Sequence, residues 1–253
     1  MHGVGKTLLR FLPTFLCVCF LSAPLELAFA GSKQTLRFSH IGKEQGLQDG
    51  SVPAIYQDRQ GLMWFGTASG LARFDGRKMT RWNANPEDIH SLSNPLVPAL
   101  LEGANQELWI GTAAGLNRLD LRTDQIDRVP MPASMTSQQK RIWALAYGDR
   151  GRIWIATQFK LLRFDPRAAA DQQFETIALQ ADPGALIRSM IPDGDGGAWA
   201  AVGSVIFHVD KDGKVKTRFD IAPTEKDVNR IQHAVRSMVI DHQSKLWIGT
   251  QSG

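Results

Sequence analysis

Trp64-Phe65-Gly66-Thr67 is a four-residue stretch that returns, with small changes, along the chain. The later copies read Trp109-Ile110-Gly111-Thr112, Trp154-Ile155-Ala156-Thr157 and Trp247-Ile248-Gly249-Thr250. A degenerate copy, Trp199-Ala200-Ala201-Val202, lies in phase, so that the tryptophans are spaced by 45, 45, 45 and 48 residues. A fixed period of this length is typical of proteins built from repeated structural units.

Other columns of residues keep the same period. Nine residues after the first four tryptophans stand Arg73, Arg118, Arg163 and His208, and eleven residues after them stand Asp75, Asp120, Asp165 and Asp210. Twelve residues before each tryptophan stand Val52, Val97, Ile142, Ile187 and Val235, followed two places later by Ala54, Ala99, Ala144, Ser189 and Ser237. Chance does not hold this many columns in register over five copies.

Each copy is predicted to form four short strands. In the first copy they are residues 52–57, 62–66, 71–74 and 78–82, and turns rich in Gly and Asp separate them. Short β-rich runs between such turns favour antiparallel hairpins, and four strands in a repeat of this length are typical of a propeller blade. We therefore predict an all-β fold, a β-propeller of four-stranded blades, present here as an incomplete ring of about four and a half blades.

The repeated columns then have structural roles. The five tryptophans are expected to fill the space between blades, and the glycine that follows Trp64-Phe65 is expected to permit a close approach of backbone or a bulge. Each repeated aspartate is expected to cap a turn through its own side chain. Residues that recur in every blade are therefore interpreted as scaffold rather than as site.

The repeat also resembles a known family. The residues that carry the resemblance are Gly46-Leu47, Val52, Gln57-Asp58, Gly61, Trp64-Phe65-Gly66-Thr67, Gly70-Leu71, Arg73-Phe74-Asp75-Gly76 and Ser91-Leu92-Ser93-Asn94. They resemble the two-component regulator propeller repeat, and the resemblance covers about residues 36–253.

The resemblance implies a ligand-sensing propeller outside the cytoplasm, in a receptor anchored in the inner membrane. The parent receptor would be dimeric and would end in a histidine kinase, often hybrid, or in a diguanylate cyclase. No enzymatic residue is carried over to this chain, because those later parts are not in it. The implied partner is a small molecule or a glycan. A secreted propeller enzyme of the lyase or lactonase type and a structural adhesion module stay open as alternatives.

The first thirty residues differ in character from the repeats. Lys6 and Arg10 precede an apolar run over residues 11–23, and Ala28-Phe29-Ala30 has the small-x-small pattern that signal peptidase accepts. We predict a secretory signal peptide over residues 1–30, export to the periplasm, and a propeller sensor domain over residues 31–253 that ends within a blade. An uncleaved anchor is the alternative. Residues 36–38 align with the fourth strand of a blade, so a later blade is expected to close the ring with them.

The composition of the chain excludes several kinds of functional site. Cys17 and Cys19 both lie in the apolar run, so the mature chain would have no disulfide and no thiol nucleophile. After residue 30 there are 27 basic and 24 acidic residues without a dense basic stripe, which argues against nucleic-acid binding. The histidines show no metal-ligand spacing, and residues 193–197 are interpreted as a turn rather than a calcium loop. We predict no metal, no cofactor and no catalytic residue.

One position of the repeat varies from copy to copy. Eleven residues before each tryptophan stand Pro53, Pro98, Trp143, Arg188 and Arg236. On inner strands, irregular side chains near one mouth of a propeller could contact a ligand, so we predict Trp143, Arg188 and Arg236 as ligand-binding residues. The alternative is that the arginines only pack by their stems between blades.

Overall fold

The computed structural model describes residues 38–47, 49–182, 184–222 and 230–252. The chain divides into two units, residues 1–39 and 40–253, and the elements described here belong to the second. The predicted signal peptide, residues 1–30, lies outside the described residues, as do residues 36 and 37 of the segment expected to close the ring. No helix in the described ranges is long and apolar enough to cross a membrane.

The second unit consists of antiparallel sheets, which we call blades one to five in chain order. Blade one contains β1 (Ala54–Gln57), β2 (Met63–Gly66), β3 (Leu71–Phe74) and β4 (Met79–Trp82). Blade two contains β5 (Ala99–Glu102), β6 (Glu107–Thr112), β7 (Gly115–Asp120) and β8 (Gln125–Arg128). Blade three contains β9 (Ile142–Tyr147), β10 (Ile153–Thr157), β11 (Leu161–Phe164) and β12 (Phe174–Ile177).

Blade four contains β13 (Ile187–Pro192), β14 (Ala198–Val202), β15 (Val205–Val209) and β16 (Val215–Asp220). Blade five contains β17 (Val235–Ile240) and β18 (Leu246–Thr250). Three short 3-10 helices, η1 (Lys43–Gln45), η2 (Asp149–Gly151) and η3 (Arg230–His233), lie in the connections. The predicted all-β propeller blades are therefore confirmed, with four strands in blades one to four.

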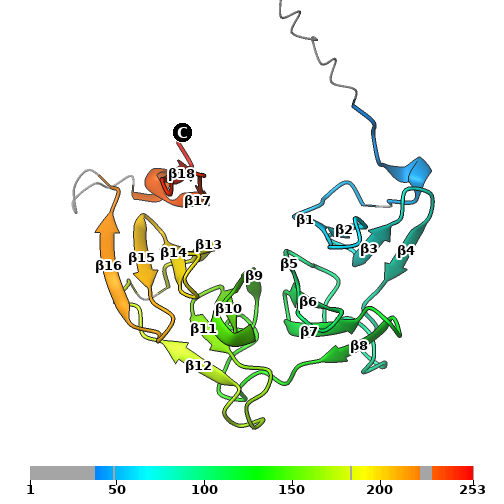
Figure 1. Ribbon diagram of the computed structural model, residues 1–253, viewed down its shortest axis with the longest axis horizontal. Helices are drawn as coiled ribbons and strands as arrows, with labels where there is room; N and C mark the ends of the chain where they lie inside the picture. The colour runs from blue at the N-terminus through cyan, green and yellow to red at the C-terminus, as the bar shows by residue number, and fades with distance from the viewer. Residues whose placement is uncertain (1–37, 48, 183, 223–229, 253) are drawn as a thin grey trace, which may run out of the picture. The chain divides into compact units, whose positions relative to one another are not determined.

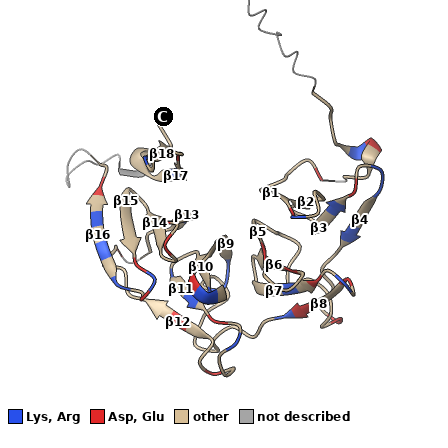
Figure 2. Cartoon of the chain, viewed as in Figure 1, with Lys and Arg blue, Asp and Glu red and all other residues tan. Residues whose placement is uncertain are grey.

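The first strand of each blade contacts the first strand of the next. These inner strands are β1, β5, β9, β13 and β17, and Figure 1 shows them on the inner side of successive blades. Small residues such as Ala54 and Ala99 stand on these strands, where the backbones of neighbouring blades come together. Figure 2 shows basic and acidic residues interspersed over the blades rather than gathered in one stripe.

The tryptophan column joins each blade to the following one. Trp64 and Trp154 are fully buried and Trp109 is 4% exposed. Trp154, for example, packs in one cluster with Ile187 and Phe207 of blade four. The prediction fails for the last tryptophan of the column, because Trp247 is 60% exposed. The face of blade five that carries Trp247 has no neighbouring blade among the described residues.

The arginine column pairs with the tryptophan column across the sheet. Trp64 stands opposite Arg73, and Trp154 stands opposite Arg163. The guanidinium carbon of Arg73 lies 5.3 Å from the ring centroids of both Trp64 and Trp82. A cation over an indole face attracts the ring quadrupole, so Arg73 stabilises the tryptophans of blade one, and Arg163 lies in the same way over Trp154.

The glycine after Trp64-Phe65 allows two blades to approach each other, as predicted. A Cβ atom on Gly66 would lie 2.3 Å from the backbone oxygen of Val97, in the next blade's entry segment. A Cβ atom on Gly111 would lie 2.5 Å from Cγ2 of Ile142. Only a residue without a side chain fits these two positions unless the neighbouring blade moves.

The repeated aspartates cap turns, which confirms their predicted role. Oδ1 of Asp75 accepts hydrogen bonds from the backbone N–H groups of Arg77 at 2.8 Å and Lys78 at 2.7 Å. Asp120, Asp165 and Asp210 accept backbone hydrogen bonds in the same way. In Asp75 these bonds, first the one from Lys78, hold the pKa of the carboxyl below its ordinary value.

Candidate functional site

The variable position before the tryptophan is an irregularity in the strand pairing of blades three, four and five. In blade four, Ile187 pairs with Val202 across β13 and β14. The next pair is Ser189 with Ala201, which leaves Arg188 between them as an inserted residue. Such a β-bulge adds one residue to a strand and turns its side chain out of the regular alternation.

The same insertion occurs in two other blades. Arg236 is passed over by the pairing of β17 with β18, and Trp143 by the pairing of β9 with β10. Pro53 and Pro98 come directly before β1 and β5. Proline has no backbone N–H, so it is tolerated at positions where the sheet does not require a hydrogen-bond donor. The bulge therefore explains why this position accepts Trp and Arg, and its place before the first paired residue explains why it accepts Pro.

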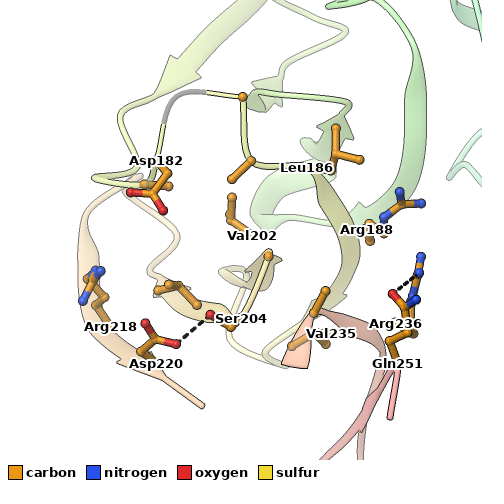
Figure 3. A pocket seen from close by; sticks show the side chains of 16 residues that line it. Asp182, Leu186, Arg188, Val202, Ser204, Arg218, Asp220, Val235, Arg236 and Gln251 are labelled. Atoms are coloured by element: carbon orange, nitrogen blue, oxygen red, sulfur yellow. Dashed lines mark hydrogen bonds between the residues drawn. The ribbon is translucent and has the colours of Figure 1, made fainter. Parts of the chain in front are cut away.

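Arg188 and Arg236 line one cavity of about 770 Å³ between blades four and five. Its walls also include two aspartates, a third arginine and several small or apolar residues. The residues shown with labels in Figure 3 are Asp182, Leu186, Arg188, Val202, Ser204, Arg218, Asp220, Val235, Arg236 and Gln251. A volume of this size is in the range of small-molecule sites.

The cavity has two polar sides. Figure 3 shows Arg188, Arg236 and Gln251 together on one side, and Asp182, Arg218 and Asp220 on the other. Apolar side chains, Leu186, Val202 and Val235, lie between the two groups. Such a site can contact an anionic group at one side and hydroxyl groups at the other.

The arginine side carries uncompensated positive charge. Partial burial, and after it the positive charge of Arg236, lower the pKa of Arg188. Arg236 donates a hydrogen bond to Oε1 of Gln251. Neither guanidinium forms an ion pair with a carboxylate of the described residues. Both side chains are exposed, which leaves them accessible to a ligand.

Trp143 lies at a different place. It lines a smaller hollow of about 260 Å³, formed on the inner strands of blades one to three together with Pro53 and Pro98. The guanidinium carbon of Arg141 lies 5.8 Å from its ring centroid. The structure thus brings two of the three predicted residues together, and it places the third in a hollow that shares no lining residue with the arginine cavity.

The opposite side of the arginine cavity was not predicted. Oγ of Ser204 donates a hydrogen bond of 2.7 Å to Oδ1 of Asp220. In blades one to three the residue after the Trp-x-Gly/Ala triplet is a threonine whose hydroxyl bonds to its own turn, as in Thr67. The fourth copy has Val202 there, and the hydroxyl of Ser204 in the following turn bonds to Asp220 at the end of β16. The signal that could have found these residues is this departure of the fourth copy from the repeat.

The turn over residues 193–197 is held together by the side chain of Asp193. Oδ1 of Asp193 accepts the backbone N–H groups of Asp195 and Gly197, each at 2.8 Å. Its Oδ2 lies 2.9 Å from Nε2 of His208, whose ring stacks on Trp199 at 4.4 Å. The part of the chain that the structure describes contains no group of three or more His, Cys, Asp or Glu placed to hold a metal ion.

A family model, the two-component regulator propeller, matches residues 46–69. Residues 46–69 carry a two-component regulator propeller repeat. One relative is histidine kinase P4 of Formosa agariphila, which is 35% identical to this chain over 69 residues. That alignment spans 27% of this chain and 5% of the relative's length.

Two solved structures share the fold of this repeat protein. The extracellular domain described as part of a hybrid two-component system of B. thetaiotaomicron has a TM-score of 0.68 at 23% identity. It is matched over 85% of this chain and 29% of its own length. Virginiamycin B lyase from Staphylococcus aureus has a TM-score of 0.60 at 16% identity, over 78% of this chain and 62% of its own. At these identities the likeness establishes the propeller fold alone.

Proposed function

We propose that this chain is the ligand-sensing propeller of a membrane-anchored signalling receptor and that it works outside the cytoplasm. The observation that carries the proposal is the match to the two-component regulator propeller over residues 46–69. The fold that the chain shares with the extracellular domain from B. thetaiotaomicron supports it further. In this proposal a histidine kinase or a diguanylate cyclase forms the output of the parent receptor, which is anchored in the inner membrane as a dimer.

The ligand in this proposal is a small molecule or a glycan that enters the arginine cavity. The cavity offers guanidinium groups, an amide and carboxylates, which recognise a ligand by charge and hydrogen bonds. Its walls come from two blades, since Arg188 belongs to β13 and Arg236 to β17. A ligand that contacts both blades changes the free energy of their contact, and a receptor can transmit only such a difference between bound and free states.

A propeller lyase is the second candidate, because the lyase from S. aureus has the same fold. That likeness, at 16% identity, extends to the fold alone. The two candidates differ in the fate of the ligand, since a sensor releases it unchanged and an enzyme converts it. A structural adhesion module differs from both, because it has no need of a small ligand in this cavity.

Ligand binding is tested by thermal unfolding of the chain with a panel of sugars and organic acids. A ligand at about 100 times its Kd adds about 2.7 kcal/mol to the free energy of unfolding. For a chain of this size we expect the Tm to rise by roughly 5–10 °C. The panel compound that raises the Tm should be recovered chemically unchanged. Its conversion to a product would favour the enzyme, and a panel without any effect would count against sensing.

Export is tested with alkaline phosphatase fused after Gly253 in a Gram-negative host. We expect phosphatase activity outside the cytoplasm and a mature N-terminus at Gly31. The matched control is the same fusion without residues 2–30, which should stay inactive in the cytosol. A full-length fusion that is found uncleaved in the cytosol would contradict the periplasmic location.

A further inference from the structure

Arg188 and Arg236 are two cations from neighbouring blades that share one cavity. We propose that they form a two-arginine clamp for an anionic group, a carboxylate or a sulfate, and that the bound anion links blade four to blade five. This inference rests on the proposed sensing function and names the chemistry that its ligand must carry.

The first support is the backbone geometry. Both arginines are the inserted residues of β-bulges on inner strands, β13 and β17. These two strands contact each other directly. A bulge redirects a side chain without using a ladder hydrogen bond, so the two guanidinium groups are presented at the boundary of the blades. Figure 3 shows them on the same side of the cavity.

The second support is electrostatic. Like charges that share a partly desolvated site disfavour each other. Among the residues of the described ranges, no carboxylate forms an ion pair with either arginine. Asp182 and Asp220 also line the cavity, but Figure 3 places them on the opposite side. An anion bound between the guanidinium groups would remove the repulsion and add attraction to both.

The third support is the arrangement of donors. A guanidinium group presents its N–H donors in a planar fork that matches a carboxylate or a sulfate. Oε1 of Gln251 accepts a bond from Arg236, which holds that fork in place. The side-chain NH₂ of Gln251 then remains as a further donor, because an amide has two N–H groups in addition to its oxygen.

The rest of the cavity limits the ligand further. Carboxylate oxygens of Asp182 and Asp220 on the far side can accept hydrogen bonds from hydroxyl groups. Leu186, Val202 and Val235 offer an apolar surface between the two sides. Both a free small anion and an acidic sugar carry the group that the clamp requires, and only the sugar would also use the far side.

The clamp is tested by calorimetric titration of the chain with D-glucuronate, D-glucose and sodium sulfate. Glucuronate and glucose differ by one carboxylate, so the clamp predicts that glucuronate binds at least tenfold more tightly. Arg188→Gln and Arg236→Gln should each weaken glucuronate binding by about 10- to 100-fold, the loss expected for charged hydrogen bonds. Sulfate that binds as tightly as glucuronate would identify a free anion as the source. Tighter binding of glucuronate would identify an acidic sugar.

Arg167→Gln is the matched control, because Arg167 is exposed, bonds to Asp165 and does not line the cavity. It should leave the affinity unchanged. Arg188→Lys keeps the charge and loses the fork, so its affinity should fall between those of the wild type and Arg188→Gln. If circular dichroism shows that Arg188→Gln does not fold, Arg188→Lys takes its place as the test of the clamp.

Three results would overturn the clamp. They are equal binding of glucuronate and glucose, wild-type affinity in both glutamine variants, and no binding of either anion to the wild type. A neutral panel compound that raises the Tm, together with any of these results, would leave the sensing function standing. No Tm response to any compound would count against the sensing function itself.

Discussion

Replacing Trp154 with Ala should lower the free energy of unfolding by about 3–5 kcal/mol, the usual loss for a large buried aromatic residue. Trp154 is fully buried and packs against Ile187 and Phe207 of the next blade. Its Nε1 also donates a hydrogen bond of 3.0 Å to the backbone oxygen of Gly196. The substitution would therefore open a cavity between blades three and four and leave that oxygen without its donor. Urea unfolding followed by circular dichroism measures the loss.

Trp247→Ala is the matched control in the same column of the repeat. Trp247 is 60% exposed, and its Nε1 donates to Oδ2 of Asp241 within its own blade. We expect this substitution to cost less than about 1 kcal/mol, as is usual for exposed positions away from the core. Equal losses for Trp154→Ala and Trp247→Ala would contradict the assignment of the column to contacts between blades.

Gly66→Ala should destabilise the chain by about 1–3 kcal/mol, the range for an overpacked position. The added Cβ atom would lie 2.3 Å from the backbone oxygen of Val97, and a backbone atom cannot move aside alone. Gly111→Ala should cost less, because its closest obstacle is the Ile142 side chain at 2.5 Å. Chemical unfolding of the two variants gives the order.

Gly50→Ala is the control for the loss of glycine flexibility. A Cβ atom on Gly50 meets no heavy atom within 4 Å. Its effect should be close to zero or slightly stabilising, since alanine restricts the unfolded chain. A loss in Gly50→Ala as large as that in Gly66→Ala would show that close approach between the blades is not the cause.

Local chemistry made most of the scaffold predictable. The turn caps of Asp75 and Asp210 depend on residues two to four places away, so one copy of the repeat already contains the information. The alternation of apolar residues places Trp109 on the face toward the next blade. The role of Gly66 was also predictable from its place after the tryptophan, although its contact, Val97, belongs to another blade.

Features that depend on pairing between strands were not predictable in the same way. The column of Pro53, Trp143 and Arg188 marked a variable position, but the bulges at Trp143 and Arg188 exist only in the register of two paired strands. The sequence also could not show that Trp143 lines a different hollow from the two arginines. Equal positions in the repeat belong to different blades, and these blades contribute to different cavities. Trp247 is exposed because no blade packs against this face of blade five among the described residues, whereas the repeat pattern predicts the same buried contact in every copy.

The bulge has a consequence for how such a protein can change its specificity. An inserted residue has no counterpart across the ladder, so exchanging it disturbs neither the hydrogen bonding of the blade nor the core behind the tryptophans. Trp143, Arg188 and Arg236 occupy this place within one chain, and Trp143 differs from the two arginines in charge, shape and hydrogen bonding. Blades three to five therefore each contribute one exchangeable side chain on their inner strands. Point mutations at these bulge positions would give new combinations of ligand-contacting side chains on an unchanged scaffold. Ligand recognition could then change without a change in folding.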